Sequence, residues 1–175
     1  MDLFFEQIVK KKRTGLDFLR VFACIFLGLI VVMALFLFSG LPGLGFIIFV
    51  VCCIIIYFLY MLITATNLEY EYTFTNGDLD VDKIINVRSR KKLIQLNARE
   101  IEVMGSAKNS RHEFEKYLND KETKKVYACE DKNAENVYFV IFFSDSVKKM
   151  LLFNPNQKIR EGFKKYNPQK VTLDD

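Results

Sequence analysis

The sequence predicts a membrane α-hairpin followed by a soluble β-rich domain, a bent sandwich or barrel of about seven antiparallel strands with a C-terminal helix. Charged residues make up 26% of the chain, yet none occurs between Val21 and Leu68. After that stretch, apolar and polar residues alternate with a period of two, which is typical of half-buried strands. These two observations divide the chain into an N-terminal basic segment at the membrane interface (1–17), an apolar hairpin (18–65) and a cytosolic domain (66–175).

The charge-free stretch indicates two membrane-spanning helices. An ionised side chain at the bilayer centre costs about 2.5–3.5 kcal/mol on insertion scales, which explains why none is found. One helix needs about 20 apolar residues to cross, and the stretch is long enough for two if a turn separates them. Gly and Pro gather at 39–45, so we predict spans at about 19–38 and 44–63. A buried soluble hairpin is disfavoured because both arms are apolar on every face.

Basic residues predict the orientation of the hairpin. Lys10, Lys11, Lys12, Arg13 and Arg20 precede the first span, and the turn between the spans carries no Lys or Arg. Positively charged flanks remain on the cytoplasmic side, and two spans return the chain to that side. The sequence therefore predicts a multi-pass protein of the cell membrane with both termini in the cytosol.

The N-terminal segment allows two interpretations. Leu3, Phe4, Phe5 and Ile8 form an apolar stripe ahead of the Lys-rich run. That pattern suits a short helix lying in the cytoplasmic interface of the membrane. In the second interpretation the basic run serves only as a topology signal.

The first half of the soluble domain reads as a meander of strands. Residues 69–75 place Tyr70, Tyr72 and Phe74 on one face, and Asn76-Gly77 then gives the strongest short-range signal for a two-residue hairpin turn. Alternation resumes at 78–85. Two further strands are predicted at 92–96 and at 101–104, the latter ended by Gly105.

The second half adds three strands and a closing helix. A short helix is expected around 112–118, followed by strands at 125–129, 137–143 and 147–153. Asn154-Pro155 has the composition of a helix N-cap and first helical residue. Ile159, Phe163 and Tyr166 then recur at helical spacing, which predicts a helix to about Lys165 that packs by that face.

The order of these elements resembles a pleckstrin-homology (PH) fold, and the whole layout resembles bacterial membrane proteins that place a two-span hairpin just before a PH-like domain. That family is largely uncharacterised, so the resemblance implies a fold more than a function. Gln95 stands where the family often has proline, and residues 105–136 have no counterpart. The segments that carry the resemblance are Tyr72-Thr73-Phe74-Thr75, Leu79-Asp80-Val81, the basic hairpin 88–92, Leu93-Ile94-Gln95-Leu96 and Ile101-Glu102-Val103.

Catalytic, cofactor and metal sites are not predicted. His112 is the chain's one histidine, and no local signature accompanies a pairing with Cys129. Asp78, Asp80 and Asp82 alternate with apolar residues, as on the wet face of a strand, and lack the loop pattern of a cation site. No strongly charged patch indicates nucleic acid as a partner.

One compact basic cluster remains in the soluble domain: Arg88, Arg90, Lys91 and Lys92. It is a candidate contact for anionic lipid or for a partner, and the alternative is a solvated hairpin tip. The leading hypothesis is a non-enzymatic bacterial membrane protein whose partners are the lipid bilayer and a protein. The alternative is an accessory subunit of a larger membrane enzyme or transporter.

Overall fold

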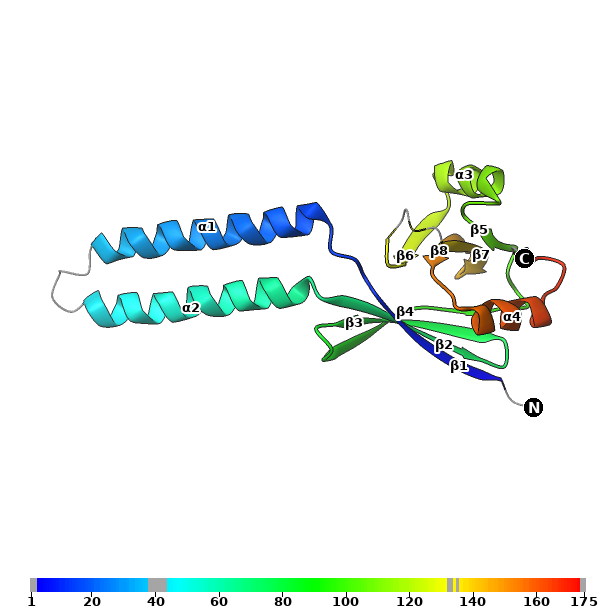
Figure 1. Cartoon of the computed structure of the whole chain (residues 1–175), viewed down its shortest axis with the longest axis horizontal. Coiled ribbons are helices and arrows are strands. Elements are labelled where there is room, and N and C mark those ends of the chain that lie inside the picture. Colours follow the sequence, from blue (N-terminus) through cyan, green and yellow to red (C-terminus); the bar gives the residue numbers. More distant parts are fainter. Residues whose placement is uncertain (1–2, 38–43, 132–133, 135, 174–175) are drawn as a thin grey trace. The chain divides into compact units, whose positions relative to one another are not determined.

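The computed structural model describes residues 3–37, 44–131, 134 and 136–173. The chain forms two compact units, a helical unit (Arg13–Asn67) and a β-unit (Met1–Lys12 with Leu68–Asp175) (Figure 1). The N-terminal residues therefore belong to the β-unit, although the sequence was divided with residues 1–17 as a separate segment. Most of the turn predicted at 39–45 lies outside the described residues.

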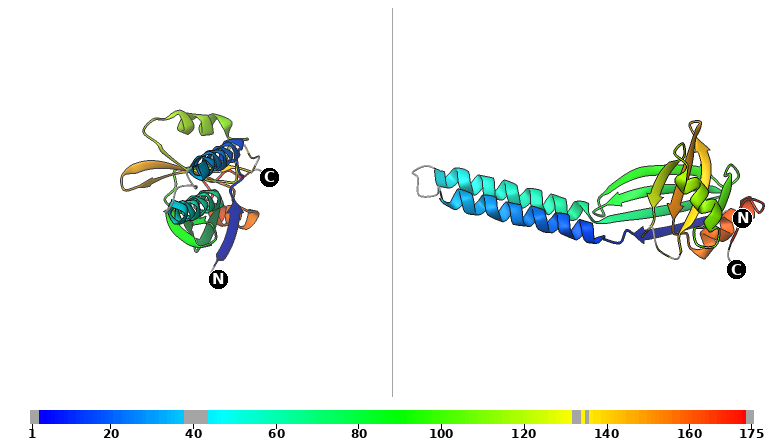
Figure 2. Two further views of the ribbon diagram at one scale, coloured as in Figure 1. Left: turned by 90° about the vertical axis from the view of Figure 1, so that its left-hand side faces the viewer. Right: turned by 90° about the horizontal axis from the view of Figure 1, so that it is seen from above.

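The helical unit contains α1 (Gly15–Leu37) and α2 (Leu44–Ala65), each long and apolar enough to cross a membrane. The two helices lie side by side in each view of Figure 2. A Cβ atom at Gly28 would lie 3.3 Å from Cδ1 of Leu59, so the missing side chain permits this close approach. The helix bounds differ by at most four residues from the predicted spans.

Four antiparallel strands form the first sheet, in the order β1-β2-β3-β4. The predicted Asn76-Gly77 turn joins β2 to β3, with φ of 51° and 103°, a conformation that asparagine and glycine tolerate best. The strands are β1 (Phe4–Lys10), β2 (Leu68–Thr75), β3 (Asp78–Ile85) and β4 (Ser89–Asn97).

Of the two interpretations of the N-terminal segment, the short interfacial helix was wrong, because residues 4–10 form strand β1. Phe5 and Val9 face the core, and the ring of Phe5 stacks on Phe74 with centroids 6.5 Å apart. The side chain of Gln7 lies on the same face and donates to the carbonyl of Asn154 at 2.8 Å, so this face holds β1 in addition to its pairing with β2. This strand brings the total in the described residues to eight, where the sequence predicted about seven.

The second sheet has the order β5-β7-β8-β6. The sequence predicted antiparallel strands throughout, but β6 and β8 form a parallel pair. The reason is that α3 (Arg111–Asn119) and the turn after it bring the chain back so that β6 runs in the same direction as β8. Gly105 was expected to end a strand but lies inside one. The strands are β5 (Val103–Ser106), β6 (Lys124–Ala128), β7 (Tyr138–Ser144) and β8 (Val147–Phe153).

Helix α4 (Gln157–Tyr166) closes the space between the sheets, as predicted. Its N-cap is Asn156, whose side chain accepts from the N–H of Ile159 at 2.9 Å, rather than the predicted Asn154. Asn154 is occupied elsewhere, since its Oδ1 accepts from the N–H of Glu130 at 2.8 Å. The helix therefore begins two residues later than predicted, because a tertiary hydrogen bond holds the side chain of Asn154.

Aromatic side chains dominate the core between the sheets and α4. Phe74 and Phe163 are fully buried with ring centroids 5.1 Å apart, and a Cβ at Gly162 would lie 2.7 Å from the Phe74 ring. The hydroxyl of Tyr72 donates to the carbonyl of Ala128, and burial raises the pKa of Tyr72. Two sheets closed by one C-terminal helix confirm the predicted bent sandwich or barrel.

Candidate functional site

The basic cluster predicted from the sequence lies at the β3–β4 hairpin. Arg88 is in the turn, and Arg90, Lys91 and Lys92 follow in β4. Antiparallel pairing places this turn at the end of the sheet where β2 begins, because Leu68 lies opposite Ile85. We call this end of the first sheet the basic end.

The same end receives the basic run that follows β1. Lys10 lies opposite Glu69, and the N–H of Lys11 donates to the carbonyl of Leu68 at 2.9 Å. Lys12 is also held, since its N–H donates to the carbonyl of Glu130 at 2.9 Å. Strand pairing thus brings together two basic segments that are far apart in the sequence.

One face of the basic end is electrically neutralised. Three ion pairs lie along it: Lys10 with Glu69 at 3.3 Å, Arg90 with Glu71 at 2.9 Å and Lys92 with Asp80 at 2.8 Å. Two of the four predicted site residues are therefore paired with acids of their own sheet.

The carboxyl group of Glu71 is buried within this row. Burial raises its pKa above the ordinary value of 4.5, and a hydrogen bond with the Glu6 side chain raises it further, while Arg90 acts in the opposite direction. The negative charges of Glu6 and Asp82 also raise the pKa of Glu71, and the Arg90 guanidinium offsets only part of the total increase.

The opposite face of the basic end carries unneutralised cations. Lys83 and Lys91 lie directly across from each other on β3 and β4, and Tyr70 lies across from Lys83. Like charges in that position repel each other. Among the residues that the structure describes, no acidic side chain lies within ion-pair distance of Lys83, Arg88 or Lys91.

The turn between these strands holds an exposed apolar side chain in a strained backbone. Val87 has a φ of 60° and is 71% exposed. Positive φ is unfavourable for a β-branched residue, and glycine occupies the corresponding place in the Asn76-Gly77 turn. The sequence analysis did not identify Val87 and Lys83 as site residues. The signal for Val87 was present, because Asn86 is not followed by the glycine that a tight turn favours.

The residues weighed for chemistry lie in unrelated surroundings. Cys129 is buried in a core cluster beneath β7 and β8, whereas His112 is exposed on α3. Asp78 accepts from the Asn97 side chain at 2.6 Å, and Asp80 pairs with Lys92. Among the described residues, no three His, Cys, Asp or Glu side chains gather as metal ligands would.

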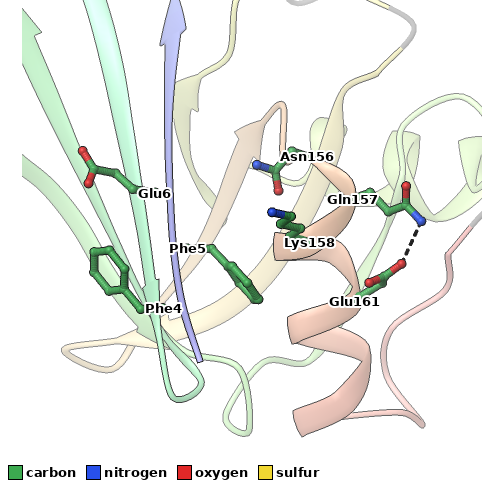
Figure 3. A pocket seen from close by; sticks show the side chains of 7 residues that line it. All are labelled: Phe4, Phe5, Glu6, Asn156, Gln157, Lys158 and Glu161. Atoms are coloured by element: carbon green, nitrogen blue, oxygen red, sulfur yellow. Dashed lines mark hydrogen bonds between the residues drawn. The ribbon is translucent and has the colours of Figure 1, made fainter. Parts of the chain in front are cut away.

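Two depressions flank β1 in the β-unit. The larger, of about 620 Å³, lies between β1 and the first turns of α4. Figure 3 shows Phe5 directed toward α4, with Phe4 and Glu6 on the other side of the strand and Gln157 hydrogen-bonded to Glu161. The smaller, of about 370 Å³, contains Arg160, which stacks on the ring of Tyr138 and donates to its hydroxyl at 2.7 Å.

Comparison with known protein families places this chain in one of them. The pattern of a family described as Bacterial PH-like domain (DUF6106) matches residues 1–173, which include both units. Searches of curated proteins and of solved structures find no match.

Proposed function

Because the chain belongs to this family of bacterial PH-like domains, we propose that it is a membrane-anchored, non-enzymatic binding module. In this proposal α1 and α2 cross the cell membrane and the β-unit works at its cytoplasmic surface. The apolar helices and the basic residues before α1 support that orientation.

One observation carries the proposal: both connections to the helical unit leave the β-unit at the basic end. β1 and β2 are neighbouring strands, and the chain departs after Lys12 and returns at Leu68. Only Thr66 and Asn67 separate α2 from β2, a connection that spans about 11 Å at most. If α2 crosses the bilayer, the chain cannot let this end of the sheet move far from the headgroups.

Reporter fusions in the native host test the anchoring. A reporter active only in the cytosol, fused after Asp175, should be active. A cysteine placed at Gly43 should react with a membrane-impermeant thiol reagent in intact cells. An inactive C-terminal reporter, together with a protected residue 43, would overturn the orientation.

A second function, as an accessory subunit of a larger membrane complex, is favoured by a groove on the helical unit. The groove has a volume of about 290 Å³ and an almost wholly apolar lining. Both helices line it, with Cys24 and Leu27 from α1 and Ile54 and Phe58 from α2, which offers an apolar surface to a partner helix.

Site-specific photo-crosslinking tests this alternative. A photoreactive residue at Ile54, which lines the groove, should capture a protein in native membranes if a partner helix packs there. The same residue at exposed Ile56, outside the groove lining, is the matched control. Equal labelling at both positions would contradict the accessory role.

A further inference from the structure

We infer that the basic end binds anionic lipid headgroups through Lys83, Arg88 and Lys91, while the Val87 side chain in the turn of the same hairpin enters the membrane surface. The inference rests on the proposed function, since the occupant is the leaflet in which the helices are anchored. It assigns the contact to a different set of residues from the cluster visible in the sequence.

Charge pairing decides which cations take part. Arg90 and Lys92 each have an acid of their own sheet within 3 Å, at 2.9 and 2.8 Å, which offsets their charge locally. Lys83 and Lys91 face each other, and Arg88 lies in the adjoining turn. Within the described part of the chain these three have no such acid, so an external anion would relieve their mutual repulsion.

Val87 supplies the second, independent observation. Two residues of the turn, Asn86 and Val87, have positive φ, and glycine would relieve the strain at the second. The chain retains instead a β-branched apolar side chain that is 71% exposed. Strain of this kind persists where a function requires the side chain. An exposed apolar tip on a hairpin that also carries Lys83, Arg88 and Lys91 fits the boundary between headgroups and acyl chains.

The position of the site in the chain identifies the occupant as a membrane. The strand that carries Lys83 pairs with β2, whose first residue follows α2 after only two residues. Lys11 and Lys12 add positive charge at the same end. Anionic lipids contribute roughly a fivefold gain in binding for each basic residue near the surface, and this gain declines with salt.

The absence of tryptophan from the chain allows a direct test. The full chain is reconstituted in nanodiscs of phosphatidylcholine, alone or mixed with phosphatidylserine, with bromine on the acyl chains as a quencher. The Val87→Trp variant should show quenched, blue-shifted emission that strengthens with phosphatidylserine and reverses at high salt. Thr75→Trp, exposed at the opposite end of β2, is the matched control and should remain unquenched in both lipids.

Two charge variants in the Val87→Trp background separate this site from general positive charge. Arg88→Ser with Lys91→Ser should lower the lipid-docked ratio by roughly fivefold for each cation removed. The double variant Arg90→Ser with Lys92→Ser removes the same formal charge but should lower the lipid-docked ratio much less. Equal losses from the two double variants would overturn the assignment, as would quenching at residue 87 that ignores phosphatidylserine.

The same samples separate this inference from the proposed function. If the chain co-elutes with nanodiscs but residue 87 stays in water, anchoring stands and the lipid site is wrong. Failure to enter nanodiscs at all would contradict both.

Discussion

At the scale of single residues, Phe163 is the side chain on which the docking of α4 most depends. Its ring is fully buried and lies against Phe74 and Phe153, with centroids 5.1 and 6.2 Å apart. Phe163→Ala should lower the free energy of unfolding of the β-unit by about 3–5 kcal/mol. Urea denaturation in mild detergent measures this, with Phe143→Ala, at a residue 57% exposed, as the control. A loss below about 1 kcal/mol would show that α4 is not docked as described.

Val87 gives a residue-scale prediction of opposite sign. Val87→Gly should raise the free energy of unfolding by about 1 kcal/mol, because glycine adopts positive φ without the clash that a Cβ causes. The same variant should weaken docking to phosphatidylserine nanodiscs. A variant that is both less stable and unchanged in lipid binding would assign Val87 a purely structural role.

Glu71 predicts a pH dependence of stability. Its pKa is raised in the folded protein, first by burial and then by the hydrogen bond with Glu6, so the folded state binds the proton more tightly. The stabilisation that Glu71 gives to the folded protein is therefore complete below the ordinary pKa of 4.5, and it is lost as the pH rises through the raised pKa. Glu71→Gln should remove this part of the pH profile in urea denaturation. Parallel profiles for the two proteins would contradict it.

At the scale of elements, β1 is required to complete the β-unit. Without it, Phe74 loses the stacked ring of Phe5, and the backbone before α4 loses both hydrogen bonds to Gln7, at 2.8 and 2.7 Å. Residues 68–175 alone should therefore be less stable than residues 3–12 joined to them by a short Gly-Ser linker. A linker suffices because Lys11 and Leu68 are hydrogen-bonded to each other. Thermal unfolding by circular dichroism compares the two, and equal midpoints would contradict the role of β1.

At the scale of the whole molecule, the proposed contact of the basic end with lipid should depend on the short connections between the units. Inserting flexible Gly-Ser segments beside Asn67 and Arg13 should leave both units folded but lower the effective concentration of the site at the membrane. The quenching of Val87→Trp should fall accordingly. Unchanged quenching would mean that lipid affinity, not tethering, holds the basic end in place.

Local signals in the sequence were sufficient for much of this protein. The stretch without charged residues between Val21 and Leu68 located both long apolar helices, because a run of apolar residues can be read without knowledge of distant contacts. Asn76-Gly77 located its hairpin, and the predicted strand at 147–153 coincides with β8. Each of these depends on neighbours in the chain.

Only the tertiary structure decided the features that depend on distant residues. β1 pairs with residues 59 to 71 positions further along the chain, so its apolar stripe could equally be read as a helix. Asn156 rather than Asn154 is the N-cap of α4, because the side-chain oxygen of Asn154 already accepts from the N–H of Glu130. The four basic residues at 88–92 look alike in the sequence, yet register places Arg90 beside Glu71 and Lys91 beside Lys83. The sequence by itself determined where positive charge gathers, whereas the register of the sheet decided which of those charges remain available, because side chains on opposite faces of one strand meet different neighbours.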